Sequence, residues 1–265
     1  MTSGEIRTRV AHAGFDDHRW FGHGIRSLVG GETLLGLIML AACGRRPRDE
    51  ERQLLEDLAV ILTVADPRIW PLKIARLVAS YGSMMAGLGA AQLCVESDAL
   101  GPWVGGPAAE LLIEVRGAAG EEPDDAAFAR AARDVIAKHP APFGYGVPLR
   151  RHDERYLMLR ARLEQLGRTS LPWWRLQERL TALLRAERQV EPNAGIGAAA
   201  MLLDMGLSPA QSRVVTVFVM EHLFLAHAVE GAEQAAPILQ ELPVESVRWV
   251  GPAPRRSPRA SSARQ

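Results

Sequence analysis

Apolar residues recur at intervals of three and four along most of the chain, and this periodicity limits the possible folds more than any other feature. Leu34, Leu35, Ile38 and Leu40 form one such stripe, and a second follows between residues 54 and 62. These intervals place side chains on one face of an α-helix, whereas a half-buried strand alternates apolar and polar residues. The same pattern predicts further helices over 71–96, 124–138, 153–166, 172–189, 194–206 and 208–230. No segment has a convincing strand pattern, so the predicted fold class is all-α.

Charge and cysteine content narrow the functional classes. The chain has 31 basic and 31 acidic residues, so no net field draws it to nucleic acid or to an anionic membrane. Cys43 and Cys94, the two cysteines, lie in apolar helical segments and are expected to stay reduced. The first 17 residues lack the apolar run of a signal peptide, and no segment reaches the roughly 18 apolar residues of a membrane span. We therefore predict a soluble cytoplasmic protein without a membrane or nucleic-acid partner.

Changes in composition divide the chain into segments. A more charged central stretch is bounded by Gly- and Pro-containing turns, which indicates a small helical domain inserted into a larger one. The C-terminal end is rich in Pro, Ser, Ala and Arg and has no large apolar anchor. The predicted segments are an N-terminal arm (1–30), the first part of a large domain (31–115), the small domain (116–190), the second part of the large domain (191–254) and a disordered tail (255–265).

Small residues fill the second half of the predicted 71–96 helix. Gly, Ala and Ser let two helix backbones approach closely. We expect this half to pack tightly, either inside the fold or across a subunit boundary. The second possibility favours a dimer.

Five short motifs follow one another in a fixed order. Two are glycine-rich turns, one introduces a small-residue helix, and two lie near the C-terminus. They are GPWVGG (101–106), PFGYGV (142–147) followed by DER (153–155), PNAGIGAAAMLLDMG (192–206), AHAVE (226–230) and VGPAPR (250–255).

In order and spacing these motifs resemble the citrate synthase superfamily, most of all its short citryl-CoA lyase-like members. Family members carry GPLHGG or HHGGA, then GFGHR with a following DPR, then PNVDG, AHxxE and a terminal GPAPR-like turn. The resemblance extends from about Glu32 to Arg255. It implies a helical large domain with a small helical domain inserted, which closes over a cleft, and it also implies a dimer.

The resemblance implies that the catalytic groups of the family are replaced. In the family, one His polarises the thioester carbonyl, a second assists at the keto carbonyl, and an Asp removes the proton next to the thioester. The aligned residues here are Val104, Tyr145 and Gly195. Val and Gly cannot transfer protons, and a Tyr hydroxyl, with a pKa of roughly 10, donates hydrogen bonds but is a poor base at neutral pH. Tyr145 is therefore the one candidate catalytic residue, as a hydrogen-bond donor.

The residues that would hold citrate or oxaloacetate also differ. The family places an Arg about seven residues before AHxxE to grip a carboxylate, and Met220 stands there, with Glu221 beside it. A second family Arg, before the terminal turn, has no well-aligned equivalent, because Arg248 comes too late. The remaining candidate cleft residues are Trp103, Asn193, His227 and Arg155. An apolar or acidic lining disfavours a tricarboxylate ligand.

The resemblance leaves room for coenzyme A. In the family the GFGH turn lies over the adenine end of coenzyme A and recognises it mainly through backbone groups. The candidate residues for this role are Phe143, Gly144, Gly146, Arg150 and Arg151. A CoA thioester is then expected as a substrate, with no permanently bound cofactor.

Several of these residues also have a purely structural explanation. His227, on an apolar helix, is typical of a hydrogen-bonded core residue, and His222 falls on a different face, so no metal site is predicted. Asp153 fits a helix N-cap, with Arg155 as a surface charge, and Asp66 fits a turn cap.

Three functions remain open. The first is a diverged enzyme of this lineage that acts on or binds a CoA thioester but is not a normal citrate synthase. The second is a non-catalytic paralogue that pairs with or regulates an active family member. The third is an ordinary citryl-CoA lyase or citrate synthase. This function would require our alignment to be wrong at several motifs at once. We favour the first, as a homodimer, because the glycines that shape the cleft are retained.

Overall fold

The computed structural model describes residues 6–63, 66–95, 104–121, 123–147, 151–234, 243–246, 248 and 250–252. Helices dominate this part of the chain, as the periodicity predicts. They are α1 (Ile25–Leu28), α2 (Leu34–Cys43), α3 (Asp49–Ile61), α4 (Trp70–Tyr81), α5 (Met84–Leu93), α6 (Gly105–Ala119), α7 (Asp125–Lys138), α8 (Glu154–Gln165), α9 (Pro172–Arg188), α10 (Ala194–Asp204), α11 (Pro209–Val219) and α12 (Glu221–Glu233). Two short 3-10 turns, η2 (Arg168–Ser170) and η3 (Val244–Ser246), complete them. The all-α class is confirmed.

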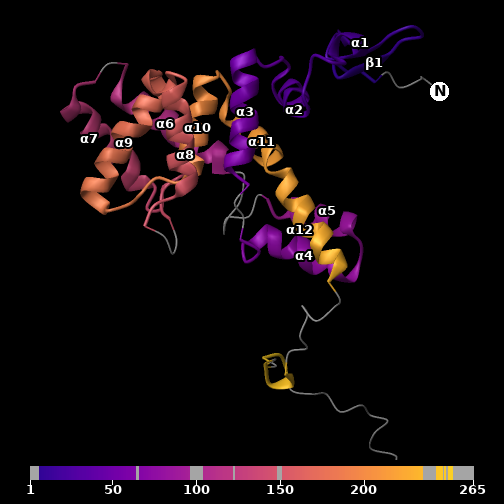
Figure 1. The fold of residues 1–265 in the computed structure, drawn as a ribbon. Helices are drawn as coiled ribbons and strands as arrows, with labels where there is room; N and C mark the ends of the chain where they lie inside the picture. The colour runs from indigo at the N-terminus through magenta and orange to yellow at the C-terminus, as the bar shows by residue number, and fades with distance from the viewer. Residues whose placement is uncertain are drawn as a thin grey trace, which may run out of the picture.

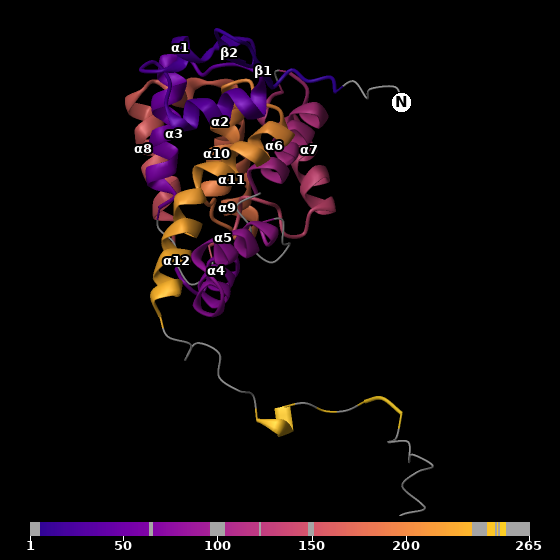
Figure 2. The same ribbon diagram turned by 90° about the vertical axis from the view of Figure 1, so that its right-hand side faces the viewer.

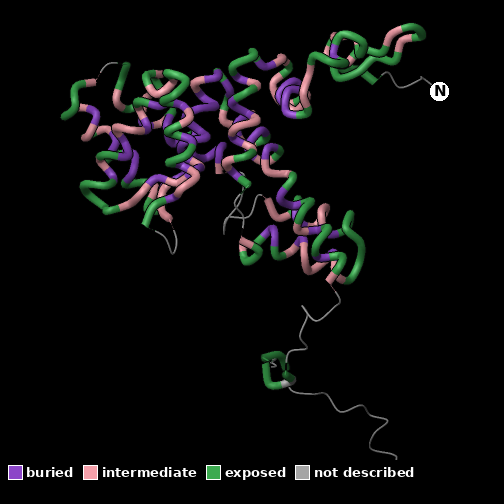
Figure 3. The backbone as a smooth tube through the Cα atoms, viewed as in Figure 1, coloured by how far each residue is buried: buried purple, intermediate pink, exposed green. Residues whose placement is uncertain are grey.

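A small antiparallel sheet near the N-terminus was not predicted. Its strands β1 (Ala11–Ala13), β2 (His18–Trp20) and β3 (His23–Gly24) pair in chain order. Strands of two or three residues are too short to show alternation in the sequence. The sheet and α1 lie at one end of the molecule, beyond α2, and are largely exposed (Figures 1 and 3).

The main hydrophobic core surrounds α10. Nearly every residue of α10 is buried, and the helix packs on α6, α8, α9 and α11 (Figure 2). Small residues such as Ala198, Ala199 and Ala200 allow these four helices to approach it closely. This core contains residues from both the predicted large and small domains. The helix α6 also continues through Arg116, where we place the boundary between them. The domain boundaries stay a prediction.

A second, smaller core joins α4, α5 and α12, which form a separate lobe in Figure 1. The predicted 71–96 helix is broken here, because Ser83 begins α5 as an N-cap and its hydroxyl accepts a hydrogen bond from the Ala86 N–H (3.2 Å). Glycines allow the close packing of this lobe. A Cβ on Gly87 would lie 2.5 Å from the Ala75 carbonyl oxygen, and one on Gly231 would lie 2.7 Å from Cα of Arg76. The small residues at these two positions therefore pack inside the subunit.

The predicted 208–230 helix is divided at Met220 into α11 and α12. Met220 packs against both cores and so joins the two lobes. Within the described residues, Pro209–Glu233 is the one stretch long and apolar enough to cross a membrane by length and composition alone, contrary to our expectation of no such stretch. It also contains the buried polar residues Ser212 and Thr216, and the core helices of soluble proteins have similar compositions.

Candidate functional site

The glycine turn at 144–146 is tied to the start of α10 by backbone and amide hydrogen bonds. The Asn193 N–H donates to the Gly144 carbonyl (2.9 Å), and the Asn193 side-chain amide donates to the Gly146 carbonyl (3.1 Å). The Asn193 side-chain oxygen accepts from the Gly195 N–H (2.8 Å) and caps α10. The Gly146 N–H donates to Glu191 (2.8 Å). One side chain thus fixes the turn and the helix end relative to each other.

Two glycines of this turn have backbone conformations that other residues rarely adopt. Gly144 has φ +84° and Gly146 φ +94°. A Cβ on Gly144 would also lie 2.6 Å from Cβ of Ile196 and 2.7 Å from its backbone nitrogen, whereas nothing lies within 4 Å of one on Gly146. At position 144, glycine is therefore required both by the positive φ and by the close approach of Ile196. At position 146 it is required by the positive φ alone.

Two positions aligned with family catalytic residues meet at this turn. A Cβ on Gly195 would lie 2.7 Å from Cγ1 of Val104 and 3.6 Å from Cα of Gly144. Val104 is the N-cap of α6, and its side chain packs on the main core. Val104, Gly144 and Gly195 therefore lie close together, and their alignment with family residues stays a prediction. Neither Val104 nor Gly195 has an ionisable group.

Tyr145 is partly buried and packs against the main core, and its hydroxyl has a partner there. Its oxygen is 3.2 Å from Oγ1 of Thr181 on α9, and Thr181 donates in turn to Gln177 (3.3 Å). The Gln177 amide donates to the Tyr156 hydroxyl (3.1 Å). Burial raises the pKa of Tyr145 far above its ordinary value, so it stays protonated. A role as donor to a ligand would require the Thr181 contact to open.

The two glycines of this turn also allow a second alignment with the family pattern. In the family pattern GFGH, the His directly follows the second glycine. If Gly144 and Gly146 are those two glycines, Tyr145 takes the place of the Phe and Val147 that of the His. Our alignment from the sequence alone pairs the family His with Tyr145. With either assignment, no imidazole stands at this position.

Asp153 links the beginnings of α8 and α10. Its carboxylate accepts from the Arg155 N–H (3.1 Å), as the predicted N-cap would, and also from the Ala194 N–H (2.8 Å). Arg155 pairs with the same carboxylate at 2.9 Å. Burial acts to raise the pKa of Asp153, but the bonds from Arg155 and Ala194 lower it below its ordinary value. The link to α10 could not be predicted, because it joins residues 41 positions apart.

The other predicted cleft and cofactor residues are more scattered. His227 lies in the α4–α12 lobe with Nδ1 3.3 Å from an Arg76 nitrogen, and Arg76 also pairs with Glu230. Burial and the Arg76 charge lower the pKa of His227 below its ordinary value. Phe143 is 37% exposed beside the glycine turn, and Arg151 is exposed. Trp103 and Arg150 lie outside the described residues.

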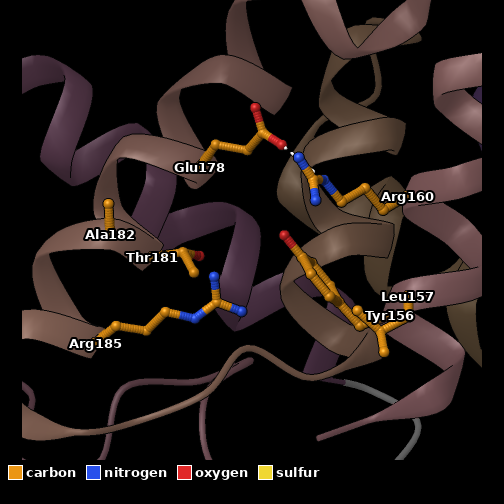
Figure 4. Close-up of a pocket in the computed structure, with 7 residues that line it drawn as sticks. All are labelled: Tyr156, Leu157, Arg160, Glu178, Thr181, Ala182 and Arg185. Carbon is orange, nitrogen blue, oxygen red and sulfur yellow. Dashed lines mark hydrogen bonds and ion pairs between the residues drawn. The ribbon is translucent and has the colours of Figure 1, made fainter.

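A shallow pocket of about 220 Å³ opens between α8 and α9 (Figure 4). Arg160 and Glu178 pair at one end of it, at 3.1 Å. Arg185 extends from α9 toward Tyr156 at the other end, and it also pairs with Glu191 at 2.7 Å. Ligand pockets usually have about 300–1,000 Å³, so this one is too small to enclose coenzyme A. Among the described residues, no group of His, Cys, Asp and Glu side chains could hold a metal ion.

Comparison with known proteins shows the fold. No protein-family model matches the sequence, and no curated protein matches it. Citryl-CoA lyase from Hydrogenobacter thermophilus matches with a TM-score of 0.77 and 20% identity, over 97% of this chain and 99% of that one. ATP citrate lyase from Methanothrix soehngenii, solved with citrate and coenzyme A, matches with a TM-score of 0.75 and 11% identity over 96% of this chain and 43% of that one. Citrate synthase from Thermoplasma acidophilum, solved with carboxymethyl coenzyme A and oxaloacetate, has a TM-score of 0.62 and 18% identity over 87% and 60%.

This chain therefore has the citrate synthase-like fold. The likeness to the citryl-CoA lyase covers nearly the full length of both chains. The fold expected from the five motifs is confirmed.

Proposed function

We propose that this protein is a diverged member of the citrate synthase lineage that binds a CoA thioester and does not perform citrate chemistry. One observation carries the proposal. Hydrogen bonds hold together the backbone frame formed by Gly144, Gly146 and Asn193, while the positions that we align with the family's catalytic residues are Val104, Tyr145 and Gly195. Ligand recognition by backbone groups survives the loss of such side chains, but proton transfer does not.

The surroundings of the turn support coenzyme A as the ligand. Exposed Phe143 offers an apolar face beside the turn, and Arg151 provides a cation for phosphate. Two structures of the same fold were solved with coenzyme A or its carboxymethyl derivative. The thioester would be a substrate or exchangeable ligand, with no permanently bound cofactor.

The described residues also argue against citrate. Met220, which we align with the carboxylate-binding Arg of the family, packs against both cores. Arg155 is already paired with Asp153, and Arg76 with Glu230. A tricarboxylate bound here would lose hydration without gaining forked Arg contacts.

The alternative function, a non-catalytic paralogue that pairs with an active family member, also has support. The Tyr145 hydroxyl is buried against Thr181, and Val104 fills the space beside Gly195. Both features are expected if side chains occupy the space in which a substrate would otherwise bind. In either case we propose a dimer, with itself or with an active homologue, located in the cytoplasm, where the free Cys43 and Cys94 would stay reduced. The balanced charge gives no reason to expect a nucleic-acid or membrane partner.

A thermal-shift screen tests the proposal. Acetyl-CoA, butyryl-CoA and free coenzyme A should each raise the Tm, since a ligand at 100 times its Kd stabilises by about 2.7 kcal/mol, and citrate should not. Phe143→Ala should reduce the CoA-dependent shift. Leu166→Ala, which truncates a similarly exposed apolar residue at the end of α8, should not. No shift with any CoA compound would favour the non-catalytic paralogue, and a shift with citrate would refute the exclusion of that ligand.

A further inference from the structure

The pocket between α8 and α9 takes no part in the proposed function, yet charged groups face it from both helices. The buried side chains of Tyr156 and Thr181 form its floor. Arg160 and Glu178 stand at one end of it and Arg185 at the other (Figure 4). Its volume of about 220 Å³ is below the range of pockets for drug-sized ligands, so it suits a small polar molecule.

Each charged group of the pocket has hydrogen-bonding capacity left. Arg160 donates to Oε1 of Glu178 through Nε (3.1 Å), and its two terminal nitrogens donate to no described residue. Oε2 of Glu178 accepts from no described residue either. Arg185 uses Nε and Nη2 for Glu191, which leaves Nη1 without an acceptor in the described part of the chain. All three side chains are partly exposed, so a ligand can reach these atoms.

The three charges lie close to one point, the Tyr156 hydroxyl. Burial raises the pKa of Tyr156, and the hydrogen bond with Gln177 opposes this. The Glu178 charge raises the pKa further, while the Arg160 and Arg185 charges lower it, so all three groups are near the hydroxyl. Figure 4 shows this hydroxyl pointing into the space between the two Arg side chains. A ligand above it can therefore contact both Arg side chains and the carboxylate.

The lining has two positive charges and one negative charge. Two carboxylates and one ammonium group match it, because each guanidinium binds a carboxylate with its fork and Glu178 accepts from an ammonium. The Arg160–Glu178 pair is partly exposed, and such pairs contribute little to stability, so both side chains can turn toward a ligand. Leu157 and Ala182 offer apolar contacts to the carbon chain between the charged ends.

We propose that this pocket binds an acidic amino acid, aspartate or glutamate. One carboxylate of the ligand pairs with Arg160 and the other with Arg185, and its ammonium group donates to Oε2 of Glu178. Citrate has a third carboxylate and no ammonium group, so it would place a negative charge against Glu178 and should not bind here. The inference does not depend on the binding of a CoA thioester.

Isothermal titration calorimetry of the full chain tests the proposal. L-Glutamate or L-aspartate should bind saturably, at one site per chain. Arg160→Gln should weaken this binding at least about tenfold, the usual effect of losing a hydrogen bond to a charged group. Arg130→Gln removes the same charge from an exposed position on α7, outside the pocket, and should leave the affinity unchanged.

Glutarate, which has both carboxylates of glutamate but no ammonium group, tests the role of Glu178. The wild type should bind it at least about tenfold more weakly than L-glutamate. Glu178→Gln should weaken the binding of L-glutamate and leave that of glutarate no weaker, because only the ammonium group needs the carboxylate.

Three results would overturn the proposal. The first is a wild type that binds neither amino acid saturably, and the second is equal affinity in Arg160→Gln and Arg130→Gln. The third is equal weakening of L-glutamate and glutarate by Glu178→Gln, since a general disturbance of the pocket would affect both ligands alike. Circular dichroism checks that each variant keeps its helix content.

Discussion

At the scale of single residues, the glycine turn shows most clearly what the sequence can and cannot predict. The PFGYGV motif is sufficient to identify Gly144 and Gly146 as important. Their different roles follow from the fold, because both have positive φ but Gly144 alone lies against Ile196.

These roles predict different costs for the same substitution. Gly146→Ala should cost about 1–2 kcal/mol, the usual penalty for a left-handed conformation. Gly144→Ala adds the contact at 2.6 Å with Ile196 and should cost at least about 1 kcal/mol more. Urea denaturation measures both free energies of unfolding. Equal losses in the two variants would contradict the close approach to α10.

The candidate site was only partly predictable at this scale. The motifs that contain Val104 and Gly195 were predicted to belong to one cleft, and in the structure both residues lie near the turn. It did not show that Tyr145 turns its hydroxyl to Thr181, nor that Asp153 holds the start of α10. Both contacts join residues far apart in the chain, and no local pattern encodes them.

At the scale of elements, the helices were predictable and their interruptions were not. Apolar periodicity continues through Ser83 and Met220, so it could not show that the chain begins a new helix near each of them. The two interruptions produce the separate helices α4, α5 and α12 that form the smaller lobe. Tight packing in this lobe depends on which glycines face a neighbouring helix.

Two glycines of α5 provide a matched test of that packing. Gly87→Ala should destabilise the protein by about 1–3 kcal/mol, because the added Cβ would lie 2.5 Å from the Ala75 carbonyl oxygen. Gly89 has open space around it, so Gly89→Ala should stabilise by about 1 kcal/mol through helix propensity. Thermal unfolding followed by circular dichroism gives both values. Stabilisation by both changes would refute the close contact of α4 and α5.

A buried carboxylate that pairs with two partly exposed Arg side chains at the start of α3 predicts sensitivity to acid. The Glu51 side chain is fully buried and pairs with Arg45 and Arg48, each at 2.7 Å, while Arg45 also donates to the Met205 carbonyl at the end of α10 (2.7 Å). Burial acts to raise the pKa of Glu51, but the bonds from both Arg side chains outweigh it and lower the pKa from 4.5 to about 2. A lowered pKa stabilises the folded state above pH 4.5, and this contribution is lost as the pH falls toward 2.

The shift corresponds to at most about 3 kcal/mol at pH 7. Glu51→Gln should therefore be clearly less stable than the wild type at pH 7. The difference should shrink between pH 4.5 and 2, as urea denaturation at several pH values would show. A difference that does not depend on pH would contradict this role for the Glu51 charge.

At the scale of the whole molecule, α11 and α12 each carry apolar side chains that are partly exposed. Val214, Phe218, Leu225 and Val229 repeat at helical spacing and are each 38–44% exposed. Neighbouring exposed apolar side chains often mark an interaction site, and a second copy of the chain can cover them around a twofold axis. We expect light scattering to give twice the 28.9 kDa chain mass.

Phe218→Glu should shift this assembly to the monomer at micromolar concentration. Val60→Glu, which adds the same charge at a 72% exposed position on α3, should leave it dimeric. A monomeric wild type, or equal disruption by both variants, would refute the dimer.

The protein keeps the citrate synthase-like fold, and an activity assay shows whether it has lost citrate chemistry, as we propose. Purified protein at micromolar concentration is supplied with citryl-CoA, or with acetyl-CoA and oxaloacetate, and free coenzyme A is measured over time. We predict no rate above background, because in our alignment three catalytic groups and a carboxylate-binding Arg are replaced, and the loss of one acid or base group typically costs roughly 10²-fold to 10⁴-fold. The triple variant Val104→His, Tyr145→His and Gly195→Asp should also remain without strong activity. Clear citryl-CoA cleavage or citrate formation by the unmodified protein would contradict the loss of citrate chemistry.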